Sequence, residues 1–180
     1  MNAGGILQCM RNRRVTRDFS ENEITREQLL QILEAGRWAP SGGNRRLHRF
    51  IAVLDPTTIR CVRAVAPGML GRPKALVIIC IDWAKVDRVG FKRHNPGVYI
   101  DTGTAGQNML LAAEALGLGA GPVTSFSQTA VRRILDLPEW LTPEMAICLG
   151  YRAAAGRSFR TLPERPTKLK DLAIWERFSG

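Results

Sequence analysis

The apolar positions along the chain predict two long helices around one central strand. In residues 20–39 the apolar side chains recur at helical spacing, and Thr25 with Gln28 forms a capping-box pair. Residues 75–81 are a continuous run rich in β-branched side chains, which is typical of a strand buried on both faces of a sheet. Residues 98–116 are small or apolar nearly all round, so we expect this helix to lie inside the molecule.

Shorter segments complete the expected order of elements. We expect further helices at residues 6–11, 56–65, 129–135 and 169–177, and further strands at residues 50–54 and 145–150. The glycines of residues 117–121 end the long helix, and an apparent strand follows. No internal repeat or linker divides the chain, so the pattern predicts a single domain over residues 1–180. This domain is expected to be an α+β sandwich, with a mixed sheet against the buried helix and an extended C-terminal arm.

Composition narrows the class of protein. Apolar residues make up 45% of the chain and charged residues 23%, as in an ordinary globular protein. No stretch approaches the roughly 20 apolar residues of a membrane-spanning helix, and residues 1–5 lack the basic head of a secretory signal. We therefore expect a cytoplasmic protein with no membrane partner. Cys80 and Cys148 lie inside apolar runs and are expected to be buried and reduced, and the cysteine spacing predicts neither a disulfide nor a metal site.

The basic charge of the chain has several interpretations. The formal net charge is +10, and most of the basic residues are arginines. Such an excess suits a phosphorylated cofactor, a nucleic acid or simply a basic surface. The cluster Asn44–Arg49 lacks interleaved aromatic side chains for base stacking, so no nucleic-acid partner is expected. With only His48 and His94 and no nucleophile-elbow serine, a hydrolytic triad is poorly supported, and chemistry would come from a bound cofactor.

Three short segments have the composition of ligand contacts, although each also has an ordinary interpretation. Residues 11–17 present arginines that suit a phosphate or a solvated basic face. In residues 40–44 a hydroxyl, two glycines and an amide let the backbone approach a ligand, as in any turn of that composition. The glycine run at residues 117–121 follows a helix, whereas a dinucleotide fingerprint follows a strand, so a Rossmann site is excluded.

Five segments stand in a fixed order along almost the whole chain. They are Arg13-Arg14-Val15-Thr16-Arg17-Asp18-Phe19, Leu33-Glu34-Ala35-Gly36-Arg37-Trp38-Ala39-Pro40-Ser41-Gly42-Gly43-Asn44, Asp101 with Ala105-Gly106-Gln107-Asn108-Met109-Leu110-Leu111-Ala112-Ala113, Gly117-Leu118-Gly119, and Leu149-Gly150-Tyr151 with Trp175-Glu176-Arg177-Phe178. Taken in this order, they resemble the FMN-dependent nitroreductase family. The resemblance implies a three-layer sandwich whose mixed sheet is mostly antiparallel. It also implies a homodimeric oxidoreductase that uses FMN and takes electrons from NADH or NADPH.

The resemblance also implies a set of site residues. Arg13 and Arg14 would hold the FMN phosphate, and Arg17 would lie at the pyrimidine edge of the ring. The other contacts implied are Pro40, Ser41 and Asn44, with the Pro-Ser part reaching in from the partner subunit, the backbone of Gly121, Pro122, Val123 and Thr124, and a second phosphate contact from Arg165 or Lys168. Reduced nicotinamide would deliver hydride and leave, and a small acceptor such as a nitroaromatic or a quinone would follow in ping-pong order. No side chain is expected to act as a dedicated catalytic residue, because the chemistry lies on the flavin.

Departures from the family pattern leave some questions open. Val15 stands where the family often has serine, so the backbone would have to serve the phosphate there. Arg46-Leu47-His48 replaces the usual Gln-Pro-Trp near the ring, which leaves the acceptor open, together with the choice between NADH and NADPH. Two alternatives also stay open: a flavin-consuming or reductive dehalogenating enzyme of the same fold, and a non-catalytic basic binding protein.

Overall fold

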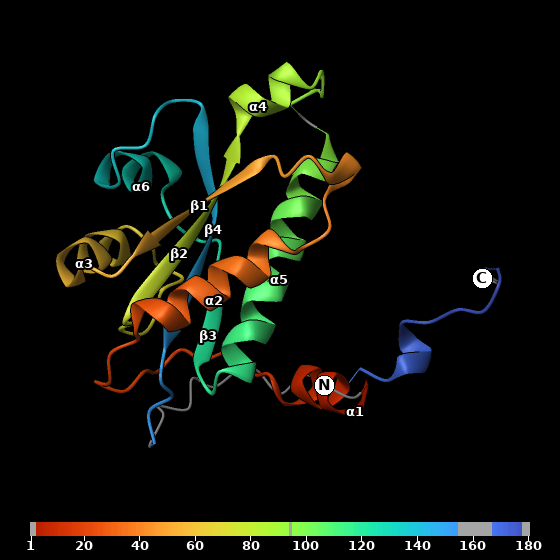
Figure 1. The fold of residues 1–180 in the computed structure, drawn as a ribbon, viewed down its shortest axis with the longest axis horizontal. Helices are drawn as coiled ribbons and strands as arrows, with labels where there is room; N and C mark the ends of the chain where they lie inside the picture. Colours follow the sequence, from red (N-terminus) through yellow and green to blue (C-terminus); the bar gives the residue numbers. More distant parts are fainter. Residues whose placement is uncertain (1–2, 94, 155–166, 178–180) are drawn as a thin grey trace.

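A four-stranded sheet lies between helices in the computed structural model, which describes residues 3–93, 95–154 and 167–177 (Figure 1). In chain order the elements are α1 (Ala3–Asn12), α2 (Arg26–Arg37), η1 (Gly42–Asn44), β1 (His48–Val53), α3 (Pro56–Ala64), β2 (Ala75–Asp82), α4 (Trp83–Arg88), α5 (Pro96–Ala115), β3 (Gly119–Val123), α6 (Gln128–Ile134), β4 (Leu141–Gly150) and η2 (Leu169–Asp171).

The strands are ordered β1-β2-β4-β3 across the sheet, and every neighbouring pair is antiparallel. All eight residues of β2 are buried, because helices cover both faces of this inner strand. The prediction of a strand buried on both faces is therefore confirmed. The expected mixed character of the sheet is limited to one parallel bridge, between Val15 and Ala120, which lies outside the four strands.

Helices on both faces of the sheet give the three expected layers (Figure 1). On one face α2 and α5 pack against each other and against the sheet, with Ile32 and Met109 in the buried cluster. On the other face α3 and α6 contribute Ile59 and Val131 to a second cluster. Each layer buries its apolar side against the next, which confirms the α+β three-layer sandwich.

The long helix α5 is buried on one side only. Asn95 caps its first turn and Pro96 follows as the first helical residue. The helix is followed by Gly117, whose φ of +73° is in the left-handed region that favours glycine. The sheet and α2 cover one side of α5, whereas on the other side Tyr99 is 46% and Ile100 62% exposed. The predicted buried helix is therefore confirmed, and the single chain leaves the side with Tyr99 and Ile100 uncovered.

The second helix is shorter than predicted. It begins directly after Thr25, and the predicted capping box is confirmed by two hydrogen bonds. The Gln28 N–H donates to Thr25 Oγ1 at 3.2 Å, and the Thr25 N–H donates to Gln28 Oε1 at 3.0 Å. Residues 20–24 stay outside the helix because the Ser20 N–H donates to the Tyr151 carbonyl at 2.8 Å, which holds this segment at the end of β4.

Three other predictions differ from the structure. Strand β4 begins at Leu141 rather than at residue 145, and its first half pairs with β2 beyond a register irregularity. Helix α4 was not predicted; the Asp82 side chain caps it by accepting the Lys85 N–H at 2.9 Å. The helix expected at residues 169–177 is only the short turn η2, and nearby Trp175 is 89% exposed. The other predicted helices and strands agree with the structure within three residues at each end.

Candidate functional site

The arginine segment, residues 13–17, lies along the edge strand β3. The Thr16 N–H donates to the Ala120 carbonyl at 2.8 Å, and Val15 forms the parallel bridge with the same residue. This approach requires glycine at position 121, because a Cβ on Gly121 would lie 2.5 Å from the Thr16 carbonyl oxygen. This backbone contact with β3 therefore fixes the position of the arginine segment at the edge of the sheet.

Arg13 carries a hydrogen-bonding group that is not satisfied. Its Nη1 atom is buried and has no partner in the part of the chain that the structure describes. A buried donor without an acceptor costs about 1–3 kcal/mol, so an anionic oxygen at this position would be bound favourably. Arg14 instead donates to the carbonyls of Arg11 and Arg13, and Arg17 is exposed.

Several predicted site residues meet at one narrow pocket beside the arginine segment. The predicted residues that line it are Val15, Arg17, Gly121, Pro122 and Val123, and the exposed Thr124 follows directly. The pocket measures about 10 Å³, which is room for about one water molecule. A planar ring cannot enter it, so a ring bound here would lie on the open surface next to the pocket.

The second predicted part of the site is the loop of residues 40–44, which follows α2. Ser41 is half-buried, and its Oγ accepts the Arg46 N–H at 3.1 Å. Gly43 and Asn44 both have left-handed φ angles, +57° and +56°, and Asn44 is exposed. Pro40 is exposed as well. The loop therefore exposes Pro40 and Asn44 at the surface and keeps Ser41 half-buried.

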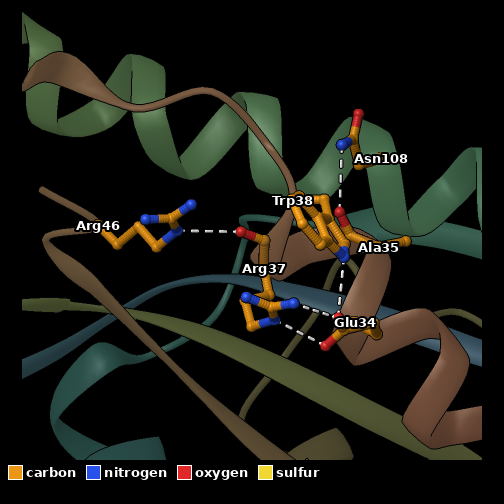
Figure 2. A network of polar contacts seen from close by, with 6 residues as sticks. All are labelled: Glu34, Ala35, Arg37, Trp38, Arg46 and Asn108. Carbon is orange, nitrogen blue, oxygen red and sulfur yellow. Dashed lines mark hydrogen bonds and ion pairs between the residues drawn. The ribbon is translucent and has the colours of Figure 1, made fainter. Parts of the chain in front are cut away.

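Helix α5 fixes this loop through three polar side chains. Asp101 is only 6% exposed, and its two carboxylate oxygens accept the Gly42 N–H at 3.0 and 3.1 Å. Thr104 Oγ1 donates to the Pro40 carbonyl at 3.1 Å. Asn108 Nδ2 donates, at 3.1 Å, to a carbonyl in the last turn of α2 (Figure 2). Sequence reasoning missed this role, although polar residues at spacing i, i+3 and i+7 in an otherwise apolar helix are a usable signal.

The two parts of the predicted site lie at opposite ends of α5. The loop contacts the first turns of the helix through Asp101, whereas α1 contacts the last turns, where Cys9 Sγ donates to the Leu111 carbonyl. At 1.5 Å per residue, Asp101 and Leu111 are about 15 Å apart along the helix. The same separation is visible in Figure 1, where the loop after α2 and helix α1 lie near different ends of α5. A single chain therefore does not bring the loop to the arginine segment.

His48 is a buried polar residue whose surroundings were not predicted. It is 6% exposed, and its Nδ1 has no hydrogen-bond partner among the described residues. Its ring stacks on Phe50 with centroids 4.9 Å apart. Burial lowers the pKa of His48, the negative charge of Asp101 opposes this, and nearby cations such as Lys85 lower the pKa further. The imidazole is therefore uncharged at neutral pH.

The remaining predicted residues lie elsewhere or outside the description. Arg165 lies outside the described residues. Lys168 is exposed and directly precedes η2, and it has no hydrogen bond or ion pair to the arginine segment among those found in the described residues. Cys80 and Cys148 are buried, as predicted, and burial raises the pKa of both thiols to about 12. Over residues 3–93, 95–154 and 167–177 there is no group of side chains that could hold a metal ion, and no helix long and apolar enough to cross a membrane.

Comparisons with known proteins single out one family. The chain matches the Nitroreductase family over residues 10–76 and 65–151. It is 30% identical over 156 residues to a putative NADH dehydrogenase/NAD(P)H nitroreductase of Methanothermobacter thermautotrophicus, a match that covers 82% of this chain and 78% of that protein. An FMN reductase of Bacillus subtilis is 26% identical over 175 residues, covering 88% and 70%. The crystal structure of a putative NADH dehydrogenase/NAD(P)H nitroreductase of Bacteroides thetaiotaomicron superposes with a TM-score of 0.79 at 27% identity, covering 98% of this chain and 100% of that one.

Proposed function

The chain belongs to the nitroreductase family, and from that premise we propose that it is an oxidoreductase that uses FMN to pass electrons from NAD(P)H to a small acceptor such as a nitroaromatic or a quinone. The observation that carries the proposal is the buried Nη1 of Arg13, a donor that has no partner among the described residues and is suited to a phosphate oxygen. FMN, when bound, supplies the acceptance and donation of hydride. We propose a cytoplasmic location, where NAD(P)H is formed and used.

The residues of the arginine segment suit both the phosphate and the ring of FMN. Arg13 and Arg14 would bind the phosphate, with the backbone of Val15 in place of a serine side chain. Arg17 is exposed at the narrow pocket beside the arginine segment and would place a positive charge near the ring. The backbone from Gly121 onward forms the neighbouring wall, and only glycine allows the arginine segment to lie against it. The chain thus contributes binding, orientation and positive potential rather than a nucleophile.

A homodimer is part of the proposal because one chain does not assemble the site. In the proposed dimer the two copies of α5 pack against each other in opposite directions, which would bring Ser41 of one chain to the arginine segment of the other. The exposed side chains of Tyr99 and Ile100 support this, since they leave part of the α5 surface uncovered in the single chain. Sedimentation is expected to report about twice the chain mass of 20.0 kDa. A monomer that retains FMN would contradict the shared site.

FMN uptake tests the function directly. The purified protein is expected to take up FMN, to show flavin absorbance and to oxidise NADH or NADPH when an acceptor is added. Arg13→Ala should weaken FMN binding by about tenfold or more, because a charge-assisted bond to the phosphate is lost. Arg133→Ala, which removes an exposed arginine of α6, is the matched control, because no residue of that helix lines the pocket beside the arginine segment. A protein that does not take up added FMN, or equal FMN affinity in the two variants, would refute the proposal.

A further inference from the structure

A separate groove lies between α2, β1 and α4. Strand β1 is at the opposite edge of the sheet from β3, the strand that the arginine segment contacts. Its volume is about 450 Å³, within the usual range of small-molecule sites. Leu33 of α2 and the half-buried Phe50 of β1 give it an apolar surface. Four cationic side chains from different elements line it: Arg37, Arg46, Arg49 and Lys85.

Two of these four cations have no carboxylate partner in the described part of the chain. Arg37 and Arg49 each form an ion pair, with a glutamate of α2 and with the buried aspartate that ends β2. Arg46 Nε instead donates to the Arg37 carbonyl at 3.1 Å, a contact drawn in Figure 2. Lys85 Nζ donates to the Arg46 carbonyl at 3.1 Å. Within the described residues, the two positive charges of Arg46 and Lys85 therefore have only backbone oxygens as hydrogen-bond partners.

His48 gives an independent indication that a ligand binds here. It lines the same groove, it is more than nine-tenths buried, and its Nδ1 has no partner among the described residues. A buried polar atom without a partner is costly, and a polar ligand that reaches Nδ1 from the groove would remove that cost. The stacked rings of His48 and Phe50 also provide an aromatic surface at the wall.

We propose that this groove binds the phosphate or carboxylate group of a molecule that also contains an aromatic ring. A phosphate monoester has a charge near −2 at neutral pH, which matches Arg46 and Lys85, the two groove cations without a carboxylate partner among the described residues. The ring would lie on Leu33 and Phe50. The groove adjoins the loop assigned to the flavin, since the Arg46 N–H donates to Ser41 Oγ.

The identity of the ligand rests on the proposed function, in which two kinds of reactant have this chemistry. One is NADPH, whose adenosine carries a phosphate at the 2′ position that NADH lacks. The other is an acceptor that is itself an anion, such as a nitroaromatic carboxylate. Either occupant would make the groove a specificity site, the first for the electron donor and the second for the acceptor.

Binding is tested on the FMN-loaded protein, in which the cofactor phosphate site is already filled. The chain has only two histidines, so a His94→Gln variant identifies the NMR signals of His48. Adenosine 2′-phosphate or para-nitrobenzoate should shift these signals saturably. The bound anion should also raise the pKa of His48, because it offsets the repulsion from nearby cations. Adenosine without a phosphate should produce no such shift.

Variants in α4 distinguish binding in the groove from a general attraction of anions to the basic surface. Lys85→Met should weaken binding of the anion about tenfold, and Lys85→Arg should restore most of it. Arg88→Met removes an exposed cation of the same helix that does not line the groove, and it should leave binding unchanged. If NADPH is the occupant, Lys85→Met raises the KM for NADPH and leaves that for NADH unchanged. If the acceptor is the occupant, it raises the KM for para-nitrobenzoate and leaves that for an uncharged nitroaromatic unchanged.

The inference is overturned if neither anion gives a saturable shift of His48, or if Arg88→Met weakens binding as much as Lys85→Met. Failure of the proposed function is a different result, since it appears as a protein that does not take up FMN. In that case the same titration is run on the FMN-free protein, and a saturable shift lost in Lys85→Met would still establish an anion site in the groove.

Discussion

Removal of the Asp101 carboxylate tests whether α5 holds the predicted loop in its binding conformation. The loop is strained, because Asn44 and Arg46 have φ angles of +56° and +47°, which cost about 1–2 kcal/mol per non-glycine residue. The hydrogen bond from the Gly42 N–H to the buried carboxylate is charge-assisted and contributes about 1.5–3 kcal/mol. The bond and the strain are of similar size, so the loop should relax when the bond is lost.

Because relief of the strain offsets part of the lost bond, Asp101→Ala is expected to lower the free energy of unfolding by only about 1 kcal/mol, which corresponds to a fall in Tm of about 2–4 °C for a chain of this size. If the strain is then relieved in the free protein, FMN binding has to restore it, and the Kd for FMN should rise about 10- to 30-fold. Circular dichroism follows unfolding of the FMN-free protein, and quenching of flavin fluorescence follows binding.

Two further variants make this experiment decisive. Asp101→Asn keeps an acceptor oxygen without the charge, so its loss of unfolding free energy should be about half of the loss in Asp101→Ala. Asp87→Ala removes an exposed aspartate that pairs with Arg93 on the surface, and its cost should stay within about 0–1 kcal/mol. The reasoning is refuted if Asp101→Ala and Asp87→Ala behave alike. A loss of stability with an unchanged Kd for FMN would refute the assignment of the loop to the flavin site.

Three other predictions follow from burial and close packing. In the native protein a thiol reagent at neutral pH should label the exposed Cys61 but not Cys80 or Cys148, whose thiols have pKa values of about 12; mass spectrometry that shows equal labelling would contradict this. Burial lowers the pKa of His48 below its ordinary 6.5, so the unfolded chain takes up the proton first as the pH falls. Stability should be complete above about pH 6.5 and decline below it, and urea unfolding should show a smaller decline in His48→Gln. Gly71→Ala would place a Cβ 1.9 Å from a carbonyl oxygen of the arginine segment, so it should cost about 1–3 kcal/mol and weaken FMN binding; unchanged unfolding and FMN titration curves would contradict this packing.

Elements whose signals are local could be predicted from the sequence. The apolar run of β2 and the capping box of Thr25 and Gln28 each act within a few residues, and both are confirmed. Helix α4 depends on an Asp82 cap at the end of a buried strand, and the first half of β4 depends on pairing with β2. Neither contact is visible in a hydrophobic pattern. The length of the second helix was overestimated for the same reason, because a hydrogen bond from Ser20 to the distant Tyr151 decides where the chain is extended.

The candidate site shows the same division. The sequence indicated the arginines and the glycines beside them, since both residue types have a direct chemical reason to face a phosphate. It did not indicate which arginine keeps a free donor, because Arg14 is satisfied by neighbouring carbonyls and Arg13 is not. The parts played by Asp101 and His48 depend on which elements pack together, and that information lies in the fold. The roles of the predicted site residues stay predictions until FMN binding is measured.

The opposite placement of the loop and the arginine segment along α5 links ligand retention to assembly. In the proposed dimer each of two equivalent sites takes one part from each subunit, so dissociation would dismantle both sites together. FMN would then strengthen the association of the subunits by the same free energy by which association strengthens FMN binding. Dilution alone would release the flavin, and an excess of flavin would keep the pair together at concentrations where the free subunits separate.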